Sequence, residues 1–521
     1  MAASPIRLGI DFGTTRTVVS AAQDGRYPVV TFDGAAGYVD FLPGLCVQRG
    51  DDLLFGDDAR AALAVGESRG MVRSIKRSIT GLGADDLVAG LHGVSALDVT
   101  TAYLTWLRRV LVERSNLEID ADAELLATVA VPANATTGQR YLTLEAFRRA
   151  GFAPQAMIGE PTAAAIEYAH NHRAVIGARS PKRYVIVYDL GGGTFDTAAV
   201  SLEGRRFTLI ASEGIARLGG EDFDAVVLDM ALEALGVDAP ALDGHARMLA
   251  LEAARQAKET LTSASRRLVV DLAAALPGSE PVLLDTAALY ERSQPLVDRS
   301  LAMTQRLFDA LPAHGIDPES KSELGGLYLV GGGVAFPAVA RALRKVYARK
   351  IQLAPHPHAA TAIGLAIAAD PDAGIFVREA TTRHFGVWRE ADAGRRQIFD
   401  PIFSKDALAG QSAMVVRRGY RPCHTIGELR FLECSALAAD GQPEGDVTPW
   451  QVIRFPYDPD LLESTGNEDL ADLTPERRRG LERQQIVETY TYGDDGTIAV
   501  AIENQTGGYR RDFVLGAMPA S

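Results

Sequence analysis

The chain has 521 residues, of which 47% are hydrophobic and 23% charged, a composition typical of globular domains rather than disordered segments. This length predicts two or three domains. The formal net charge of −14 argues against binding to nucleic acid or to an anionic membrane surface, because both need a basic face.

The first half of the chain predicts a strand–turn–strand unit that occurs twice. Residues 6–10 and 18–22 are apolar runs joined by the polar turn FGTTRT, a pattern typical of a β-hairpin. Residues 183–202, RYVIVYDLGGGTFDTAAVSL, repeat the order strand, Gly/Thr turn, strand. The repeat, about 180 residues further on, indicates two similar lobes with a ligand in the cleft between them.

Helices are predicted where apolar residues recur at helical spacing: 100–113, 138–150, 160–168 and much of 222–264. Pro161 lies in the first turn of the third helix, where its missing N–H costs nothing. A strand that ends in three glycines is predicted within 326–339, ahead of another helix. This order of elements predicts an α/β fold for the first part of the chain.

The pattern changes near Asp370. Residues 371–380 combine a turn-rich segment with a short apolar run, which predicts a linker. From 381 onward, apolar and polar residues alternate as in strands, and two such runs around Gly-Asp-Asp-Gly predict a hairpin within 486–504. We therefore expect an α/β unit over 1–370, a linker over 371–380 and a β-rich domain over 381–521.

The three cysteines, Cys46, Cys423 and Cys434, form no Cys-x-x-Cys pair. Neither a disulfide framework nor a thiolate zinc site is expected, and the nine histidines show no metal-binding spacing. The N-terminus MAASPIRLGIDFG lacks the apolar core of a signal peptide, and no apolar run reaches about eighteen residues. These features predict a cytoplasmic protein.

Three glycine-rich turns, each after a predicted strand, carry the chemistry: Asp11–Thr15, Asp189–Asp196 and Gly331–Gly333. Glycine lets the backbone approach a phosphate closely, and successive N–H groups form an anion cradle. The aspartates Asp11, Asp189 and Asp196 would repel phosphates unless Mg²⁺ lay between, held largely through waters. Such an arrangement stabilises charge in phosphoryl transfer and orients an attacking water. One such turn is equally compatible with a plain hairpin, but two matching turns and a glycine triplet favour a nucleotide site.

The sequence resembles the seventy-kilodalton heat-shock chaperones of the DnaK type, in the actin/hexokinase superfamily. The resemblance rests on IDFGTTRT, EPTAAAIEY, YDLGGGTFD, LGGEDFD and LVGGG, in the family's order over roughly residues 5–370. It implies an actin-like (ribonuclease-H-type) two-lobed ATPase domain over 1–370. For 381–521, where the match is weaker, it implies a peptide-binding β-sandwich without the family's helical lid.

The resemblance also implies a function and its partners. The chain would be a chaperone that binds ATP or ADP with Mg²⁺ and hydrolyses ATP slowly to regulate binding of unfolded polypeptides. A co-chaperone and a nucleotide-exchange factor are possible further partners, whereas no nucleic acid or membrane is expected. Two alternatives stay open: a nucleotide-gated binding or scaffold protein with little turnover, and a small-molecule kinase, which is disfavoured because LGGEDFD has no role there.

By resemblance, the catalytic residues are Lys76, Glu160, Asp189, Asp196 and Thr194. Without the surrounding motifs, Lys76 is an ordinary solvated lysine and Glu160 a favourable charge at a helix N-terminus. The metal would be held by Asp11, Asp189 and Asp196. The nucleotide would contact Asp11, Gly13, Thr14, Thr15, Gly191, Gly192, Gly193, Gly219, Gly220, Glu221, Lys258, Thr262, Gly331, Gly332 and Gly333.

The chain departs from the family's pattern around the adenosine. Arg255 stands where the family has Glu, and Glu259 where it has Arg, so the two are expected to pair as i and i+4 on one helix. Ala335 replaces a second arginine that stacks on adenine, and His358 replaces an aspartate. Because two stacking guanidinium planes are missing, the sequence predicts weaker nucleotide binding than is usual in the family.

Overall fold

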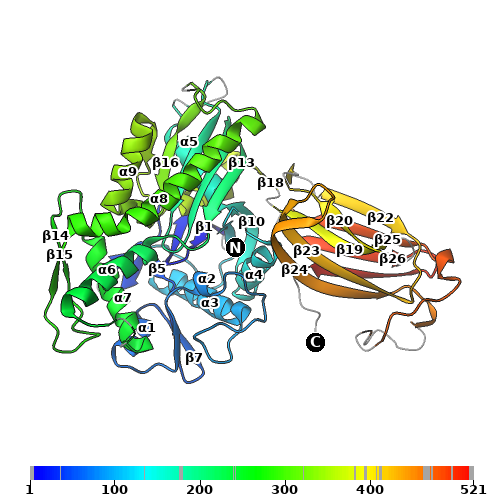
Figure 1. Cartoon of the computed structure of the whole chain (residues 1–521), viewed down its shortest axis with the longest axis horizontal. Helices are drawn as coiled ribbons and strands as arrows, with labels where there is room; N and C mark the ends of the chain where they lie inside the picture. Colours follow the sequence, from blue (N-terminus) through cyan, green and yellow to red (C-terminus); the bar gives the residue numbers. More distant parts are fainter. Residues whose placement is uncertain are drawn as a thin grey trace. The chain divides into compact units, whose positions relative to one another are not determined.

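The computed structural model describes residues 5–515 except 36, 134, 175, 177–179, 239, 241, 321, 381–382, 392–395, 406–407, 410–413, 462–469, 471–472 and 494–496. The chain forms two compact units (Figure 1). The first comprises residues 1–133 and 144–377, and the second comprises 378–521 together with 134–143. The described helices include none that is both long and apolar enough to cross a membrane.

One sheet of the first unit is built around the predicted N-terminal hairpin. Strands β1 (Ile6–Phe12) and β2 (Arg16–Ala21) pair antiparallel, as the two apolar runs predict. Strand β9 (Leu125–Val131) lies parallel to β1, and β10 (Ala153–Gly159) lies parallel to β9. The short β5 (Leu42–Pro43) pairs antiparallel with β2 and completes the order β10-β9-β1-β2-β5.

A second sheet repeats this pairing. Its hairpin is antiparallel and is followed on one side by two parallel strands, in the order β17-β16-β11-β12-β13-β18. The strands are β11 (Tyr184–Leu190), β12 (Phe195–Glu203), β13 (Arg206–Ile215), β16 (Leu324–Val330), β17 (Ile351–Leu353) and β18 (Phe376–Ala380). The first unit is therefore a mixed α/β structure in which two sheets share one hairpin-plus-parallel arrangement.

Two helices, α5 (Glu160–Asn171) and α10 (Ala360–Ala369), connect the two sheets of the first unit. Helix α5 packs on β11 and β12, and α10 contacts β1 and β2. The helices approach so closely that a Cβ on Gly364 would lie 1.8 Å from the Ala163 carbonyl oxygen. Small residues at this crossing therefore hold the two hairpins at a short, defined separation.

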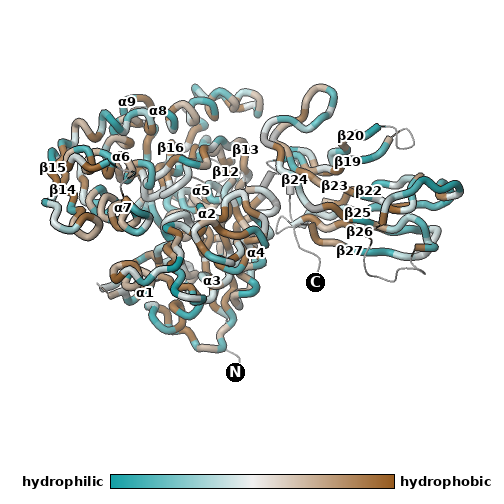
Figure 2. Tube along the Cα trace, turned by 60° about the horizontal axis from the view of Figure 1, so that its bottom comes forward, coloured by the Kyte–Doolittle hydropathy of each residue, from teal (hydrophilic) through white to brown (hydrophobic). Residues whose placement is uncertain are grey.

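The remaining helices cover the sheets of the first unit or lie in its connections. In Figure 2 the outer helices α8 and α9 change between hydrophilic and hydrophobic along their length, as amphipathic helices do. These helices are α1 (Gly56–Ala64), α2 (Ile75–Ser78), α3 (Ala96–Arg114), α4 (Thr137–Arg149), α6 (Gly220–Leu235), α7 (Gly244–Glu259), α8 (Thr286–Ala310) and α9 (Pro337–Tyr347), with the 3-10 turns η2 (Leu311–His314), η3 (Gly332–Ala335) and η4 (Ala348–Lys350). The predicted helices 100–113, 138–150 and 160–168 fall within α3, α4 and α5 to within a few residues. Two strand pairs and a three-stranded sheet complete the first unit. The pairs are β3 (Phe32–Gly34) with β4 (Gly37–Val39) and β14 (Arg267–Val270) with β15 (Val282–Asp285), and the sheet has β6 (Cys46–Arg49) between β7 (Asp52–Phe55) and β8 (Gly70–Val72).

The segment predicted to be a linker, 371–380, contains the turn η5 (Pro371–Ala373) and strand β18. The Phe376 N–H donates to the Arg205 carbonyl oxygen at 2.9 Å, and Ile375 and Val377 pack against the core of the second sheet. An apolar run beside an open strand edge gains backbone hydrogen bonds by pairing with it. Part of this segment is therefore regular sheet.

The second unit consists of two four-stranded antiparallel sheets, in the orders β20-β19-β23-β24 and β22-β25-β26-β27. One hydrophobic core contains residues of both sheets, including Val387, Phe431, Tyr490 and Ile502. The strands are β19 (His384–Ala391), β20 (Arg396–Phe403), β22 (Met414–Tyr420), β23 (Ile426–Leu437), β24 (Pro443–Pro456), β25 (Ile486–Tyr492), β26 (Ile498–Asn504) and β27 (Tyr509–Leu515); β21 (Leu408–Ala409) pairs with the end of β18, and η6 spans Leu481–Arg483. The predicted hairpin is the pair β25–β26, and its turn residues 494–496 lie outside the described part.

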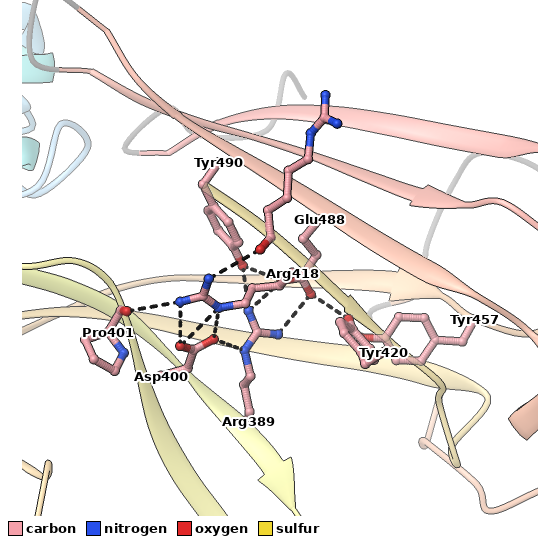
Figure 3. Close-up of polar contacts among 9 residues, drawn as sticks. Arg389, Asp400, Pro401, Arg418, Tyr420, Tyr457, Glu488 and Tyr490 are labelled. Carbon is pink, nitrogen blue, oxygen red and sulfur yellow. Dashed lines mark hydrogen bonds and ion pairs between the residues drawn. The ribbon is translucent and has the colours of Figure 1, made fainter. Parts of the chain in front are cut away.

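A buried polar cluster lies within the core of the second unit (Figure 3). Glu488 is fully buried and accepts hydrogen bonds from the Arg389 guanidinium at 2.7 and 3.2 Å. The hydroxyl groups of Tyr420 and Tyr490 also donate to Glu488, at 2.5 and 2.6 Å. Arg389 donates to Asp400 as well, at 2.5 Å. The buried charge of Glu488 is thus compensated by Arg389 of the opposite sheet, which also pairs with Asp400 on the neighbouring strand β20.

A second buried carboxyl group, Glu167 on α5, predicts how stability depends on pH. It is 2% exposed, and burial raises its pKa from 4.5 to about 7, although hydrogen bonds from Tyr328 and Asn171 act in the opposite direction. Because the folded state then binds the proton more tightly than the unfolded state, stability is lost as pH rises from about 4.5 to about 7. The loss is about 3 kcal/mol at about 1.4 kcal/mol per pKa unit.

We therefore expect Glu167→Gln to gain stability relative to the wild type as pH rises through this range, because the amide has no charged form. The measurement is the free energy of unfolding in urea for both proteins at about pH 5 and about pH 8. Other titrating groups cancel in the difference between the proteins. A difference that does not change with pH would contradict the prediction.

Candidate functional site

The three glycine-rich turns meet at one cavity of about 370 Å³ in the first unit. The turn between β1 and β2 contributes Asp11 and Thr14, and the turn between β11 and β12 contributes Asp189 and Thr194. The third turn follows β16 and contributes the glycine triplet that begins at Gly331. The paired hairpins thus place their corresponding aspartates on one cavity, as the repeat predicts.

Glycine is required at this cavity for steric reasons. Gly331 has φ +83°, and a Cβ there would lie 2.4 Å from Asp189 Oδ1. A Cβ on Gly192 would lie 2.2 Å from Thr15 Oγ1. Any larger residue would displace the side chains of the opposite turn. The turns therefore form a narrow, backbone-lined surface suited to an anion such as phosphate.

An acidic cluster with a central lysine lies on the same cavity. Lys76 Nζ lies 2.6 Å from Glu160 Oε1. Burial, and after it the charge of Glu160, raises the pKa of Asp11 and of Asp196 to about 7, against the effect of Lys76. The pKa of Asp189 is raised by burial and by the other carboxylates. Burial lowers the pKa of Lys76, but Glu160 and Asp11 raise it by more.

These residues fit Mg²⁺. Four carboxylates, of which Glu160 and Asp196 are buried and the other two partly buried, lie around the Lys76 ammonium, so the cluster carries more negative charge than this cation neutralises. Oxygen donors of this kind are those that Mg²⁺ prefers, and it commonly binds through one or two carboxylates together with phosphates. The arrangement is suited to phosphoryl transfer, in which a cation stabilises charge and a carboxylate orients water.

A second set of ion pairs closes another side of the cavity. Asp224, which is 1% exposed, pairs with Lys258 at 2.6 Å and with Arg73 at 2.7 Å. Lys258 also donates to the Gly220 carbonyl oxygen at 2.7 Å. Arg77 pairs with Glu221. Arg73, just before α2, and Arg77, within α2, thus pair with residues of α6. Because Asp224 of α6 also pairs with Lys258 of α7, these contacts hold the predicted site residues Lys258 and Glu221 in position.

Sequence reasoning did not identify Arg73, Arg77 or Asp224 as part of the site. Asp224 ends the motif LGGEDFD, which is the available signal, but its buried ion pairs connect residues far apart in the chain. Arg73 and Arg77 lie in a segment with no distinctive pattern. Arg73 and Arg77 join the site only through their ion pairs with Asp224 and Glu221 of α6, which form when the chain folds.

At the position where the sequence departs from the family's adenosine-site pattern, three charged side chains contact one another in series: Arg255, Glu259 and Arg16. Arg255 Nη1 lies 3.0 Å from Glu259 Oε1, which confirms the expected i,i+4 pair. The same oxygen lies 2.8 Å from Arg16 Nη2, and the Arg16 guanidinium stacks 4.2 Å above the centre of the Phe41 ring. Sequence reasoning did not identify Arg16 as a cavity residue. Because its guanidinium contacts Glu259 and Phe41, it is not available to stack on the base of a nucleotide.

Most of the predicted site residues line the cavity: Asp11, Gly13, Thr14, Thr15, Lys76, Glu160, Asp189, Gly191, Gly192, Thr194, Gly220, Glu221, Lys258, Gly331, Gly332 and Gly333. Asp196 is buried beside them, Gly193 lies within the second turn and faces Thr14 of the first, and Gly219 packs against Gly192 and Gly193. Thr262 is not among the lining residues; it is exposed and bonds to Ser265 Oγ at 3.1 Å. Ala335 and His358 line the cavity, and His358 lies 2.8 Å from Asp40.

Comparison with known proteins gives one family match and several similar proteins. A family model described as Hsp70 protein matches residues 7–381. The chain is similar to the chaperone protein HscA homologs of Burkholderia multivorans (32% identity over 389 residues, 71% of this chain and 59% of that protein) and Pseudomonas fluorescens SBW25 (31% over 386 residues, 71% and 58%). The homolog of Variovorax paradoxus is 31% identical over 384 residues, again 71% of this chain and 59% of that protein. The aligned regions thus span less than two thirds of these relatives' length.

Proposed function

The chain belongs to the Hsp70 family, and on that premise we propose that it is an ATP-dependent molecular chaperone. It would bind and slowly hydrolyse ATP with Mg²⁺ to regulate binding of unfolded polypeptide. The observation that carries this proposal is the cavity where two Asp-x-Gly turns meet the Lys76–Glu160 pair. A co-chaperone and a nucleotide-exchange factor are proposed as further partners.

We propose an actin-like domain of two lobes over 1–370, followed by a linker over 371–380. The repeated hairpin-plus-parallel pairing of the two sheets supports this assignment. We also propose that 381–521 is a β-sandwich that binds extended peptide. The shared core of its two four-stranded sheets supports the sandwich. ATP hydrolysis would then shift this domain between states of different peptide affinity.

In the proposed mechanism the glycine-rich turns hold the phosphates through backbone N–H groups, with Thr14, Thr15 and Thr194 as added donors. Asp11, Asp189 and Asp196 would hold Mg²⁺, which would supply positive charge that stabilises phosphoryl transfer. Glu160 pairs with the Lys76 ammonium at 2.6 Å and holds it in the cluster. One of the aspartates would accept a proton from the attacking water.

We expect ATP and ADP to bind with a dissociation constant of about 1 μM or weaker, because the described cavity residues offer the base no free guanidinium plane. Arg255 and Arg16 are engaged by Glu259, and Ala335 has no side chain that can stack. Isothermal titration calorimetry with Mg²⁺ measures this constant. Glu259→Arg, which returns the family's residue, should tighten binding, and Glu291→Arg, the same charge change at an exposed position on α8 that does not line the cavity, is the matched control. Nanomolar binding by the wild type would contradict this prediction.

The proposed function is tested by Mg²⁺-dependent ATP turnover of the full chain, with and without an unfolded peptide. Slow turnover that peptide increases supports the chaperone. Binding of ATP without turnover would instead support a nucleotide-gated scaffold, which the Arg255–Glu259 pairing favours as second candidate. Formation of a phosphorylated sugar would reveal a kinase, which family membership does not favour.

A further inference from the structure

The second unit contains a cluster of metal-ligating side chains far from the nucleotide cavity in sequence. Glu390 stands near the end of β19, and Cys423 and His424 stand on the connection from β22 to β23. Their ligand atoms all lie within 4.8 Å of one another. His424 Nδ1 lies 2.7 Å from Glu390 Oε2 and 3.5 Å from Cys423 Sγ. The spacing of cysteines and histidines along the chain did not predict this cluster, because Glu390 comes from a distant strand.

A tetrahedral metal ion could bridge these atoms after a small movement of one side chain. Bonds of about 2.0–2.3 Å from zinc to O, N and S place neighbouring ligand atoms about 3.3–3.8 Å apart. The Cys–His separation of 3.5 Å already lies in that range, and the His–Glu separation of 2.7 Å would need to widen by at least about 0.6 Å, which the half-exposed Glu390 side chain allows. All three donors are at least partly accessible, since the His424 side chain is 19% exposed and that of Glu390 is 51% exposed.

We propose that Cys423, His424 and Glu390 bind one Zn²⁺ ion, with water as the fourth ligand. Thiolate, imidazole and carboxylate together favour zinc over the hard cations Mg²⁺ and Ca²⁺, which select oxygen donors. One thiolate and one carboxylate also neutralise the two charges of the ion. Arg477 pairs with His424 through the backbone and lies beside the thiol, so it leaves one positive charge at the rim of the site.

The bound ion would tie the connection between β22 and β23 to strand β19. Cys423 and His424 lie where the chain passes from β22 in one sheet to β23 in the other. Glu390 belongs to β19, which pairs with β23. A metal that binds only the folded arrangement raises its stability by mass action. Zinc is therefore expected to raise the melting temperature of the wild type.

The test uses the full chain, stripped of metal with a chelator and kept in excess Mg²⁺ to occupy the nucleotide cavity. We expect one equivalent of Zn²⁺ with a dissociation constant below about 1 μM. Co²⁺ in place of zinc should give the near-ultraviolet charge-transfer band of a thiolate ligand. The described residues that line the nucleotide cavity include no cysteine, so this band distinguishes the two sites.

Cys423→Ser and His424→Gln should each weaken zinc binding at least about 100-fold and abolish the zinc-induced rise in melting temperature. Cys423→Ser should also abolish the cobalt band. Cys434→Ala is the matched control, because Cys434 is a fully buried thiol in the same unit and should leave both signals intact. The proposal is overturned if the wild type binds no zinc, shows no thiolate band, or binds zinc no more tightly than the two variants; the Glu390–His424 contact is then a simple ion pair.

Discussion

Asp189→Asn and Lys76→Ala are each expected to lower the rate of ATP hydrolysis at least about 100-fold while the protein still binds nucleotide. The Lys76 ammonium lies among four buried or partly buried carboxylates, so its loss leaves their repulsion uncompensated when the phosphates arrive. The amide that Asp189→Asn introduces would keep the shape of the aspartate but lose the charge that attracts Mg²⁺ and orients water. The measurement is single-turnover hydrolysis of ATP with Mg²⁺ in excess.

Two variants of the same chemical kind serve as controls for this result. Asp238→Asn and Lys345→Ala alter exposed residues of the first unit that do not line the cavity, and both should hydrolyse ATP at the wild-type rate. Calorimetric binding of ADP shows that the inactive variants remain folded. If Asp189→Asn or Lys76→Ala hydrolysed ATP at the wild-type rate, the catalytic role proposed for the substituted residue would be contradicted.

Glu488→Ala is expected to destabilise the second unit by about 3–5 kcal/mol, the largest loss of stability that we predict. Glu488 is fully buried and compensates the Arg389 guanidinium, which lies 2.7 Å away (Figure 3). Its removal leaves Arg389 with Asp400, which Arg418 already contacts at 3.0 Å. It also removes the acceptor for the Tyr420 and Tyr490 hydroxyl groups.

Tryptophan fluorescence can report this unfolding selectively. Trp388 and Trp450 lie in the second unit, so a Trp106→Phe background removes the signal of the first unit. Glu428→Gln is the control, because Glu428 is a partly exposed carboxylate of the same unit that pairs with Arg430 and Arg454, whose side chains are 54% and 27% exposed. Exposed pairs contribute about 0–1 kcal/mol, so this variant should lose little. Equal losses for Glu488→Ala and Glu428→Gln would show that the buried cluster has no special role.

Local patterns predicted the elements that carry the nucleotide chemistry. The apolar runs around FGTTRT and LGGGTF predicted the hairpins β1–β2 and β11–β12, because a tight glycine turn between strands needs only neighbouring residues. The family resemblance added Lys76 and Glu160, which the structure brings to 2.6 Å. It also named Thr262, which the structure leaves exposed just beyond α7, where it caps the following turn through Ser265.

Contacts between distant segments could not be predicted in this way. The segment 371–380 pairs with β13 because that strand has an open edge, a property of the assembled sheet. The Arg16–Glu259 pair joins residues 243 positions apart, and Arg389–Glu488 joins residues 99 apart. No spacing rule connects such residues, since their proximity follows from the packing of whole elements.

Short motifs in the chain were enough to predict the family, the two hairpins with their glycine turns and the residues of the acidic cluster, because these depend on backbone conformation and neighbouring residues. Which charges are compensated emerged only from the folded chain. Folding engages Arg16 with Glu259, buries Glu488 against Arg389, and places Glu390 within reach of Cys423 and His424. Electrostatic and metal-binding interactions act through space over a few ångströms, so they depend on the folded arrangement and not on separation along the chain.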